Sequence, residues 1–209
     1  MAGGISMDEK VDVLLQNAEH YMDNKRYDEA ISEYQKALDL GSIEALVELG
    51  EIYYVGFATK RDNKKAFEYL KQAAEAGNFK GMFWLGKMYA CGYGVEIDAK
   101  SAIYWIEKAA NGENTDAMVY IAETYSPIRG DINPETGVRE AYIGNTSIQR
   151  EADIEKAVEW YLRAIEVNDH KIMMEKLLKG RKNKQKNDNN IERARKALIE
   201  LWKYQLGKY

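Results

Sequence analysis

The sequence contains little of the chemistry on which most enzymes and secreted domains depend. Its 209 residues include one cysteine and two histidines. The single cysteine, Cys91, excludes an internal disulfide framework and is typical of a reducing compartment. The two histidines, His20 and His170, are far apart in the chain and offer no metal-ligand spacing. We therefore predict no catalytic residues, no metal site and no cofactor.

Motifs for nucleotide and acyl chemistry are missing as well. The chain has no Gly-rich phosphate loop and no G-x-S-x-G motif. Its carboxylates are numerous, but no spacing singles out an acid–base pair, so a solvated charged face is the better interpretation of them. We predict that the protein is not an enzyme and has no small-molecule substrate.

Long apolar runs are also absent. No segment reaches the roughly 18 apolar residues that a membrane-spanning helix needs. The N-terminus lacks the apolar core of a signal peptide and carries Asp8 and Glu9. We predict a cytoplasmic protein without a membrane partner.

Charge is present in quantity but is unevenly distributed. Residues 1–169 hold 18 basic and 30 acidic side chains, a net charge of −12, whereas residues 170–209 hold 12 basic and 4 acidic, a net charge of +8. The basic C-terminal segment is able to attract polyanions, but the acidic body repels them. Nucleic-acid or anionic-surface binding through this segment is therefore an alternative function.

Proline is scarce, with two residues in the chain, and the residues that favour helices are abundant. Aligning the chain on itself at a spacing of 36 residues brings Ala45, Gly81 and Ala117 into register. The same spacing aligns further apolar positions that follow i, i+4, i+5, i+8, which is one face of a helix. These positions, on what we call helix A of each unit, are Leu49, Leu85 and Ile121; Gly50, Gly86 and Ala122; and Tyr53, Tyr89 and Tyr125.

A second helix, helix B, repeats in the same period through Ala30, Ala66 and Ala102. The pattern returns at Ala157, which is 19 residues late, so the fourth unit carries an insertion within 126–152. Short polar residues precede both helices of most units, where their side chains are able to accept a backbone N–H. They are Ser42, Asn78, Asn114 and Asp169 before helix A, and Asp62, Asp98 and Asp153 before helix B. Glycines mark the A-to-B loops, at Gly56, Gly92, Gly94 and Gly130.

These residues resemble a known family. The third unit, from Gly81 to Ala110, follows the pattern A-x-x-x-L-G-x-x-Y-x-x-G-x-G-V-x-x-D-x-x-K-A-x-x-W-x-x-K-A-A, with departures at Gly81 and Ser101, and is similar to the Sel1-like repeat (SLR), a relative of the tetratricopeptide repeat (TPR). The second unit keeps most of the pattern, and the first looks like an ordinary TPR. The resemblance implies an all-α, right-handed α-α superhelical solenoid of TPR/SLR-type helix pairs. It also implies a protein-binding scaffold.

We expect four repeats over residues 11–169 and an N-terminal tail over 1–10, whose first six residues would be an expression scar. After Asp169 we expect a fifth helix A, a basic loop over 179–190 and an amphipathic helix over 191–206. Residues 170–209 would then cap the solenoid. The whole chain should form at least nine helices and essentially no strand.

The helix phase also predicts a binding groove. In stacked helix pairs the A helices line the concave surface. In the second to fourth units, helix A has a small residue at Gly50, Gly86 or Ala122, and the residues three before, one after and four after it should face the concave surface. An apolar strip with charged edges suits peptide or helix capture, so we expect a protein or peptide partner. The alternative is that some of these side chains belong to the core between repeats. The expected groove residues are Val47, Glu51, Tyr54, Phe83, Lys87, Val119 and Glu123.

Overall fold

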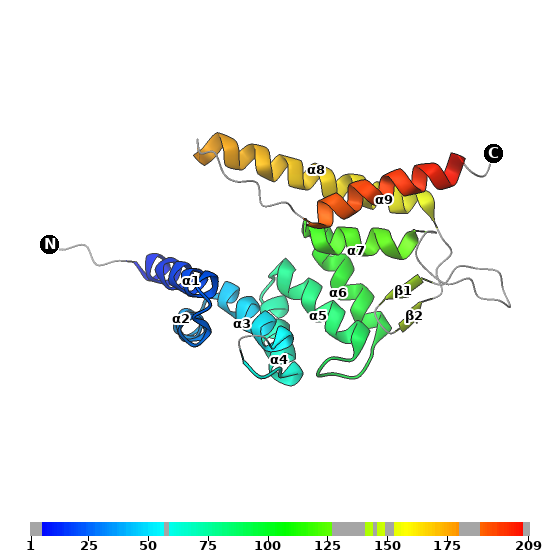
Figure 1. The fold of residues 1–209 in the computed structure, drawn as a ribbon. Helices are drawn as coiled ribbons and strands as arrows, with labels where there is room; N and C mark the ends of the chain where they lie inside the picture. Colours follow the sequence, from blue (N-terminus) through cyan, green and yellow to red (C-terminus); the bar gives the residue numbers. More distant parts are fainter. Residues whose placement is uncertain are drawn as a thin grey trace.

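The structure, a computed structural model, describes residues 6–56, 59–126, 141–143, 146–148, 153–179 and 189–206. Within these ranges it is an all-α chain of nine helices with one short hairpin (Figure 1). The helices are α1 (Met7–Asp23), α2 (Tyr27–Asp39), α3 (Ile43–Val55), α4 (Asn63–Glu75), α5 (Phe79–Cys91), α6 (Ala99–Asn111), α7 (Thr115–Tyr125), α8 (Ile154–Lys179) and α9 (Asn189–Leu206). The strands are β1 (Ala141–Ile143) and β2 (Thr146–Ile148).

The helices pack in sequential pairs, as the repeat predicts. Helices α1, α3, α5 and α7 are the A helices, and each packs against the B helix that follows it, from α2 to α8. Every B helix up to α6 also contacts the next A helix, so the pairs stack into one continuous array (Figure 1). The solenoid architecture predicted from the 36-residue period is thus confirmed.

The predicted caps start most of these helices. Ser42, Asn78 and Asn114 accept the backbone N–H three residues later at 3.2, 2.9 and 2.8 Å, which satisfies a donor that the helix itself cannot. The B helices α4, α6 and α8 use Asp62, Asp98 and Asp153 in the same way. Three of the predicted loop glycines, Gly56, Gly92 and Gly94, lie between A and B helices, and Gly130 lies outside the described residues.

Small residues occur where the two helices of a pair approach closely. A Cβ added to Gly86 would lie 2.5 Å from Ile106 Cγ1 and 3.0 Å from the carbonyl oxygen of Ala102. Ala102 and its counterpart Ala66 have no exposed surface. The repeated glycine and alanine positions therefore set the separation of each A helix from its B helix.

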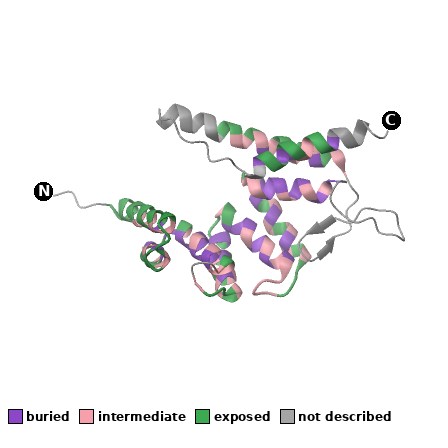
Figure 2. Ribbon diagram, in the orientation of Figure 1, coloured by how far each residue is buried: buried purple, intermediate pink, exposed green. Residues whose placement is uncertain are grey.

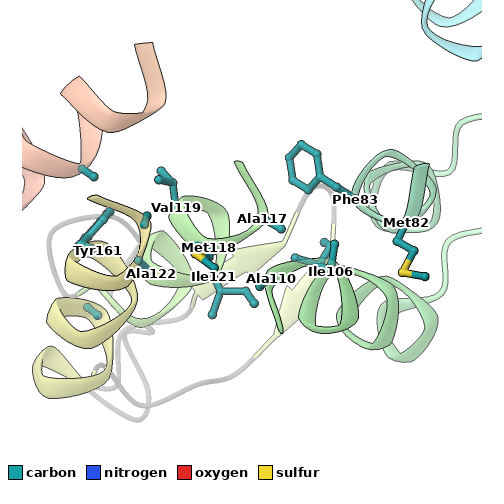
Figure 3. Close-up of a cluster of buried hydrophobic side chains, with 14 of the residues drawn as sticks. Met82, Phe83, Ile106, Ala110, Ala117, Met118, Val119, Ile121, Ala122 and Tyr161 are labelled. Atoms are coloured by element: carbon teal, nitrogen blue, oxygen red, sulfur yellow. The ribbon is translucent and has the colours of Figure 1, made fainter. Parts of the chain in front are cut away.

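The core follows the A helices along the array. Figure 2 shows buried residues concentrated on α3, α5 and α7, whereas α1 buries only Ala18. The largest cluster joins α5, α6 and α7 to α8 and α9 through residues such as Leu85, Ile106, Met118 and Tyr161. Part of this cluster is drawn in Figure 3. No single pair encloses this core, so each unit depends on its neighbours for stability.

Helix α8 differs from the prediction. A break was expected before Asp169, but α8 continues without interruption to Lys179. The three earlier B-to-A junctions each contain a glycine, at Gly41, Gly77 and Gly112, and a residue with positive φ. The corresponding segment 167–169 has no glycine and stays helical, and the expected fifth helix A becomes an extension of α8.

Helix α9 takes the next place in the array instead. It packs against both α7 and α8, and Figure 1 shows it lying across them. Ile191, Ala194 and Leu201 are at most 3% exposed, which confirms the predicted amphipathic helix in this segment. Residues 180–188, which form most of the predicted basic loop, lie outside the described residues.

The insertion was expected to contain turns but no strand, and that expectation is wrong for one part of it. Strands β1 and β2 pair antiparallel, with Ala141 opposite Ile148 and Ile143 opposite Thr146. Strand β1 lies near α5 and α7, and the remainder of 127–152 is outside the described residues.

Candidate protein-binding face

Five aromatic rings follow one another across the A helices. We call Tyr93, Tyr54, Trp84, Phe83 and Tyr120 the aromatic ladder. Their ring centroids are separated in that order by 5.6, 5.1, 5.9 and 6.0 Å. The rings come from α3, α5, α7 and the loop after α5, so three successive repeats contribute to one row. These separations are those of aromatic pairs in direct contact.

The ladder rests on a buried apolar layer. Tyr54, Trp84 and Tyr93 pack against a cluster that contains Val47, Leu70 and Met88. All three rings are half-buried, so one part of each ring is held by the core while another part remains accessible. A row of fixed and partly exposed rings presents contact area whose side-chain entropy is already reduced before a partner binds.

Two cations lie over the ladder. The Arg61 guanidinium is 5.3 Å from the centroid of Tyr54 and 5.0 Å from that of Tyr93. The Lys87 ammonium is 4.3 Å from the centroid of Trp84. Both arrangements are within the range of cation–π attraction.

A carboxylate pair forms the other edge. The Trp84 indole N–H donates to Glu51 at 2.8 Å, and the Lys80 ammonium lies 2.7 Å from Glu51 and 2.9 Å from Glu48. Burial raises the pKa of Glu51 above its ordinary value, although Lys80 acts in the opposite direction. Burial lowers the pKa of Lys80, but the two carboxylates outweigh it and the net shift is upward. Lys80 therefore remains charged and fixes Glu51 beside the indole.

The seven predicted groove residues fall into two groups. Glu51, Tyr54 and Lys87 are half-buried and lie at the ladder or its edge. Phe83 belongs to the ladder but is only 6% exposed. In Figure 3 Phe83 and Val119 point to one side of the cluster, and Met82 and Ile121 point to the other.

The remaining predicted residues offer less surface to a partner. Val47 and Val119 are 2% and 1% exposed, so they belong to the inter-repeat core and support the face from below. Glu123 on α7 accepts a hydrogen bond from Arg193 of α9 at 2.6 Å. At the C-terminal end of the face, α9 therefore occupies a position next to α7.

Several residues of this face were not predicted. Trp84 and Tyr120 are adjacent in sequence to predicted positions, but the three phases used for helix A omitted them. Arg61 and Tyr93 lie in loops, where helix periodicity gives no direction. The available signal was the repeated Asp before helix B, because the backbone N–H groups of Asp62 and Asp98 donate to Tyr53 and Tyr89 and so return both loops to the end of their A helix.

No group of three or more His, Cys, Asp and Glu side chains in the described part of the chain is arranged to hold a metal ion. None of the helices in those ranges is long and apolar enough to cross a membrane. Cys91 is a free, half-buried thiol.

Comparison with known families gives three matches to the Sel1 repeat, over residues 43–78, 80–114 and 141–169. The chain belongs to the Sel1 repeat (SLR) family of TPR-like helical repeats. Residues 11–42, which resemble an ordinary TPR, precede the matched segments. The gap between the second and third matches contains α7 and most of the insertion, which separates the two helices of the fourth unit.

Comparison with solved structures also gives matches to Sel1 repeat proteins. The crystal structure of a Sel1 repeat protein from Oxalobacter formigenes has 27% sequence identity and a TM-score of 0.58, covering 90% of this chain and 69% of that one. A protective antigen present in uropathogenic Escherichia coli strains, which displays an SLR fold, has 20% identity and a TM-score of 0.49. That alignment covers 82% of this chain and 33% of the antigen. No curated protein matches the sequence.

Proposed function

We propose that the protein is a non-catalytic adaptor or scaffold that holds a peptide or protein segment along the aromatic ladder. The observation that carries the proposal is the continuity of the ladder, whose successive rings are 5.1 to 6.0 Å apart across three repeats. Sel1 repeats generally mediate protein interactions. Four of the rings, Tyr54, Trp84, Tyr93 and Tyr120, are partly exposed. Partly exposed aromatic residues are the kind of surface that supplies most of the binding energy at protein interfaces.

The charged groups at the edges would have a separate role. Apolar anchors at the centre of an interface dominate its affinity, whereas charges at the rim mainly set orientation and association rate. Glu51 and Lys87 occupy such rim positions here, beside Trp84. We therefore expect the rings to determine how tightly a segment binds, and the charges to determine which segment binds.

Binding of nucleic acid through the basic C-terminal segment is the weaker proposal. Residues 1–169 carry a net charge of −12, which opposes the approach of a polyanion to the repeats. The carboxylates of Glu48 and Glu51 also lie beside the ladder. A protein partner accommodates this mixture of charges more readily than a phosphate backbone does.

We also propose a cytoplasmic location, since the chain has a single cysteine and that thiol is free. Fractionation of the native cells should recover the protein with cytoplasmic markers. Its recovery in a periplasmic or secreted fraction would contradict this location without bearing on the binding face.

The binding proposal is tested by affinity capture from the native cell, followed by titration of the captured partner against ladder variants. Tyr54→Ala and Trp84→Ala should each weaken binding by about 1–3 kcal/mol, as expected for anchor residues. Tyr104→Ala is the matched control, because Tyr104 is a 56% exposed aromatic residue on the B helix α6. Thermal melts of all three variants would show whether each remains folded.

Equal affinity of the parent and both ladder variants for the partner would exclude the ladder as the binding surface. Weakening by Tyr104→Ala alone would move the interface to the B helices. If both ladder variants unfold at the temperature of the titration, Tyr54→Phe and Trp84→Phe supply milder changes for the same comparison.

A further inference from the structure

Within the described ranges, two of the cations on the ladder face form no ion pair with a carboxylate. Among the described residues, no Asp or Glu oxygen forms an ion pair with Lys87 or Arg61. Arg61 donates instead to the neutral side chain of Asn63 at 2.9 Å. The charges of both side chains are therefore directed over aromatic rings rather than toward opposite charges.

Other cations on the same side of the array are paired. Lys80 lies within 2.9 Å of two carboxylates, and Arg193 lies 2.6 Å from Glu123. The face therefore has carboxylates that pair with some of its basic groups, but none of the described carboxylates forms an ion pair with Lys87 or Arg61. The difference is local, since Lys80 and Lys87 are both on α5.

Lys87 is held in a position that is unfavourable for an isolated charge. Its side chain is half-buried, and burial lowers the pKa of its ammonium group below the ordinary value, although the nearby carboxylates of Asp116 and Glu51 act in the opposite direction. An incoming carboxylate would offset this loss of hydration with a charge-assisted hydrogen bond. The rings of Trp84 and Tyr54 lie between Lys87 and Arg61.

We propose that the ladder selects an internal peptide segment with acidic side chains flanking an apolar or aromatic residue. One carboxylate would bind Lys87, another would bind Arg61, and the apolar side chain between them would lie on Trp84 and Tyr54. This inference rests on the proposed function and specifies the chemistry of the partner at the same face. Internal carboxylates, rather than a single chain terminus, suit two separate cations that come from neighbouring repeats.

A single-stranded nucleic acid is the competing ligand, because cations and aromatic rings also bind phosphates and bases. Glu48 and Glu51 lie beside Trp84 and would repel a phosphate backbone that followed the ladder. An acidic peptide is able to place its few carboxylates away from this pair. The observations therefore favour the peptide.

The test is a selection from phage-displayed random peptides of about 12 residues, long enough to cross several repeats at roughly 3.3 Å per extended residue. The peptides are joined to the coat protein through their C-termini, so every carboxylate that they offer is an Asp or Glu side chain. The whole chain is used as bait in three forms: the parent, the double variant Arg61→Glu/Lys87→Glu and the control Lys108→Glu. Lys108 also lies over two rings, Tyr104 and Trp105, but on α6.

The parent and Lys108→Glu should enrich peptides with acidic residues beside an aromatic or large apolar residue, and the double variant should not. In a synthetic copy of an enriched peptide, exchanging each acidic residue for its amide should weaken binding to the parent about tenfold. The double variant should lose this tenfold preference. Circular dichroism and thermal melts confirm that each bait is folded.

Enriched peptides with no preference for acid, whose binding is still lost in Tyr54→Ala, would overturn this inference and leave the ladder as a binding surface. Binding that is unaffected by both Tyr54→Ala and Trp84→Ala would contradict the ladder itself. Failure of the parent to enrich any peptide also overturns the inference. Tighter, ladder-dependent binding of a fluorescent uridine oligonucleotide than of the best peptide would favour nucleic acid instead.

Discussion

At Gly86 the absence of a side chain determines how closely α5 packs on α6. A Cβ at this position would already be 2.5 Å from Ile106, well inside van der Waals contact. Gly86→Leu should therefore destabilise the protein by about 1–3 kcal/mol through overpacking. Urea denaturation measures the change.

The matched control for this substitution is Ser32→Leu, which adds the same side chain at an exposed position of α2. A surface change of this kind should alter the free energy of unfolding by less than about 0.5 kcal/mol. If Gly86→Leu is as stable as Ser32→Leu, the repeat positions are assigned incorrectly.

Glu51 connects the ladder to Lys80, and its hydrogen bond to Trp84 predicts losses of different size for two substitutions. Glu51→Ala removes the acceptor of the Trp84 indole N–H and should cost about 1 kcal/mol, the usual value of such a hydrogen bond. Glu51→Gln keeps an acceptor oxygen and should cost less. Thermal or urea melts of both variants at neutral pH make the comparison, and equal losses would show that the indole bond contributes nothing.

The pH dependence of stability gives a second test of Glu51. Burial raises its pKa in the folded chain, so the folded state binds more protons than the unfolded state just above the ordinary value of 4.5. The contribution of Glu51 to stability therefore increases as the pH falls from neutrality through this window. Urea titrations at neutral pH and at about pH 5 should show a gain for the parent relative to Glu51→Gln. A loss would contradict the burial of the carboxylate.

Single residues were predicted well where a repeat fixed their position. Ser42, Asn78 and Asn114 act as caps because the 36-residue spacing places each before a helix A. The helix phase also selected Tyr54 as a groove residue, and its role in binding stays a prediction. Arg61 was not predicted, because it lies in a loop, and a helical repeat pattern does not predict the direction of a loop side chain.

At the scale of the element, α8 shows how a missing glycine changes the course of the chain. The residue that corresponds to Gly41 and Gly77 in the repeat is Asn168, and it remains within the helix. Asn168→Gly should weaken α8 by about 0.3 kcal/mol, because glycine is a somewhat poorer helix former than asparagine. Asn168→Ala should leave its stability unchanged or slightly higher.

The measurement for this pair is hydrogen exchange followed by proteolysis and mass spectrometry. Asn168→Gly should increase amide exchange on both sides of residue 168, and Asn168→Ala should decrease it. Fast exchange around residue 168 in the parent itself would indicate that the helix is interrupted there, as the repeat pattern alone predicts.

The elements that the repeat specifies were thus predicted more reliably than those outside it. Helices α3 to α7 follow from a period that is present in several units. The hairpin of β1 and β2 occurs once, in the insertion, and its short strands give no recurring signal. The same reason explains why the prediction divided α8 into two helices. The prediction continued the 36-residue period past the last unit that contains the turn glycine.

At the scale of the whole molecule, the stacking of helix pairs brings residues from distant parts of the sequence into one row. Tyr54 and Tyr120 are in different units, yet two rings of α5 connect them. No unit alone contains the ladder. A function carried by this row would therefore depend on the order and spacing of the repeats, which could be predicted from the sequence. It would also depend on the positions of loop residues, which could not.

The central claim is that a partner binds along the ladder rather than on the B helices. Incorporating 5-fluorotryptophan and recording fluorine NMR spectra tests it directly, since the chain has four tryptophans and each resonance is assigned by a Trp→Phe variant. Trp84 lies in the ladder, whereas Trp105 and Trp160 lie on the B helices α6 and α8. Titration with the captured partner should shift or broaden the Trp84 resonance and leave those of Trp105 and Trp160 unchanged. An unchanged Trp84 resonance, with a shift at Trp105 or Trp160, would contradict the account.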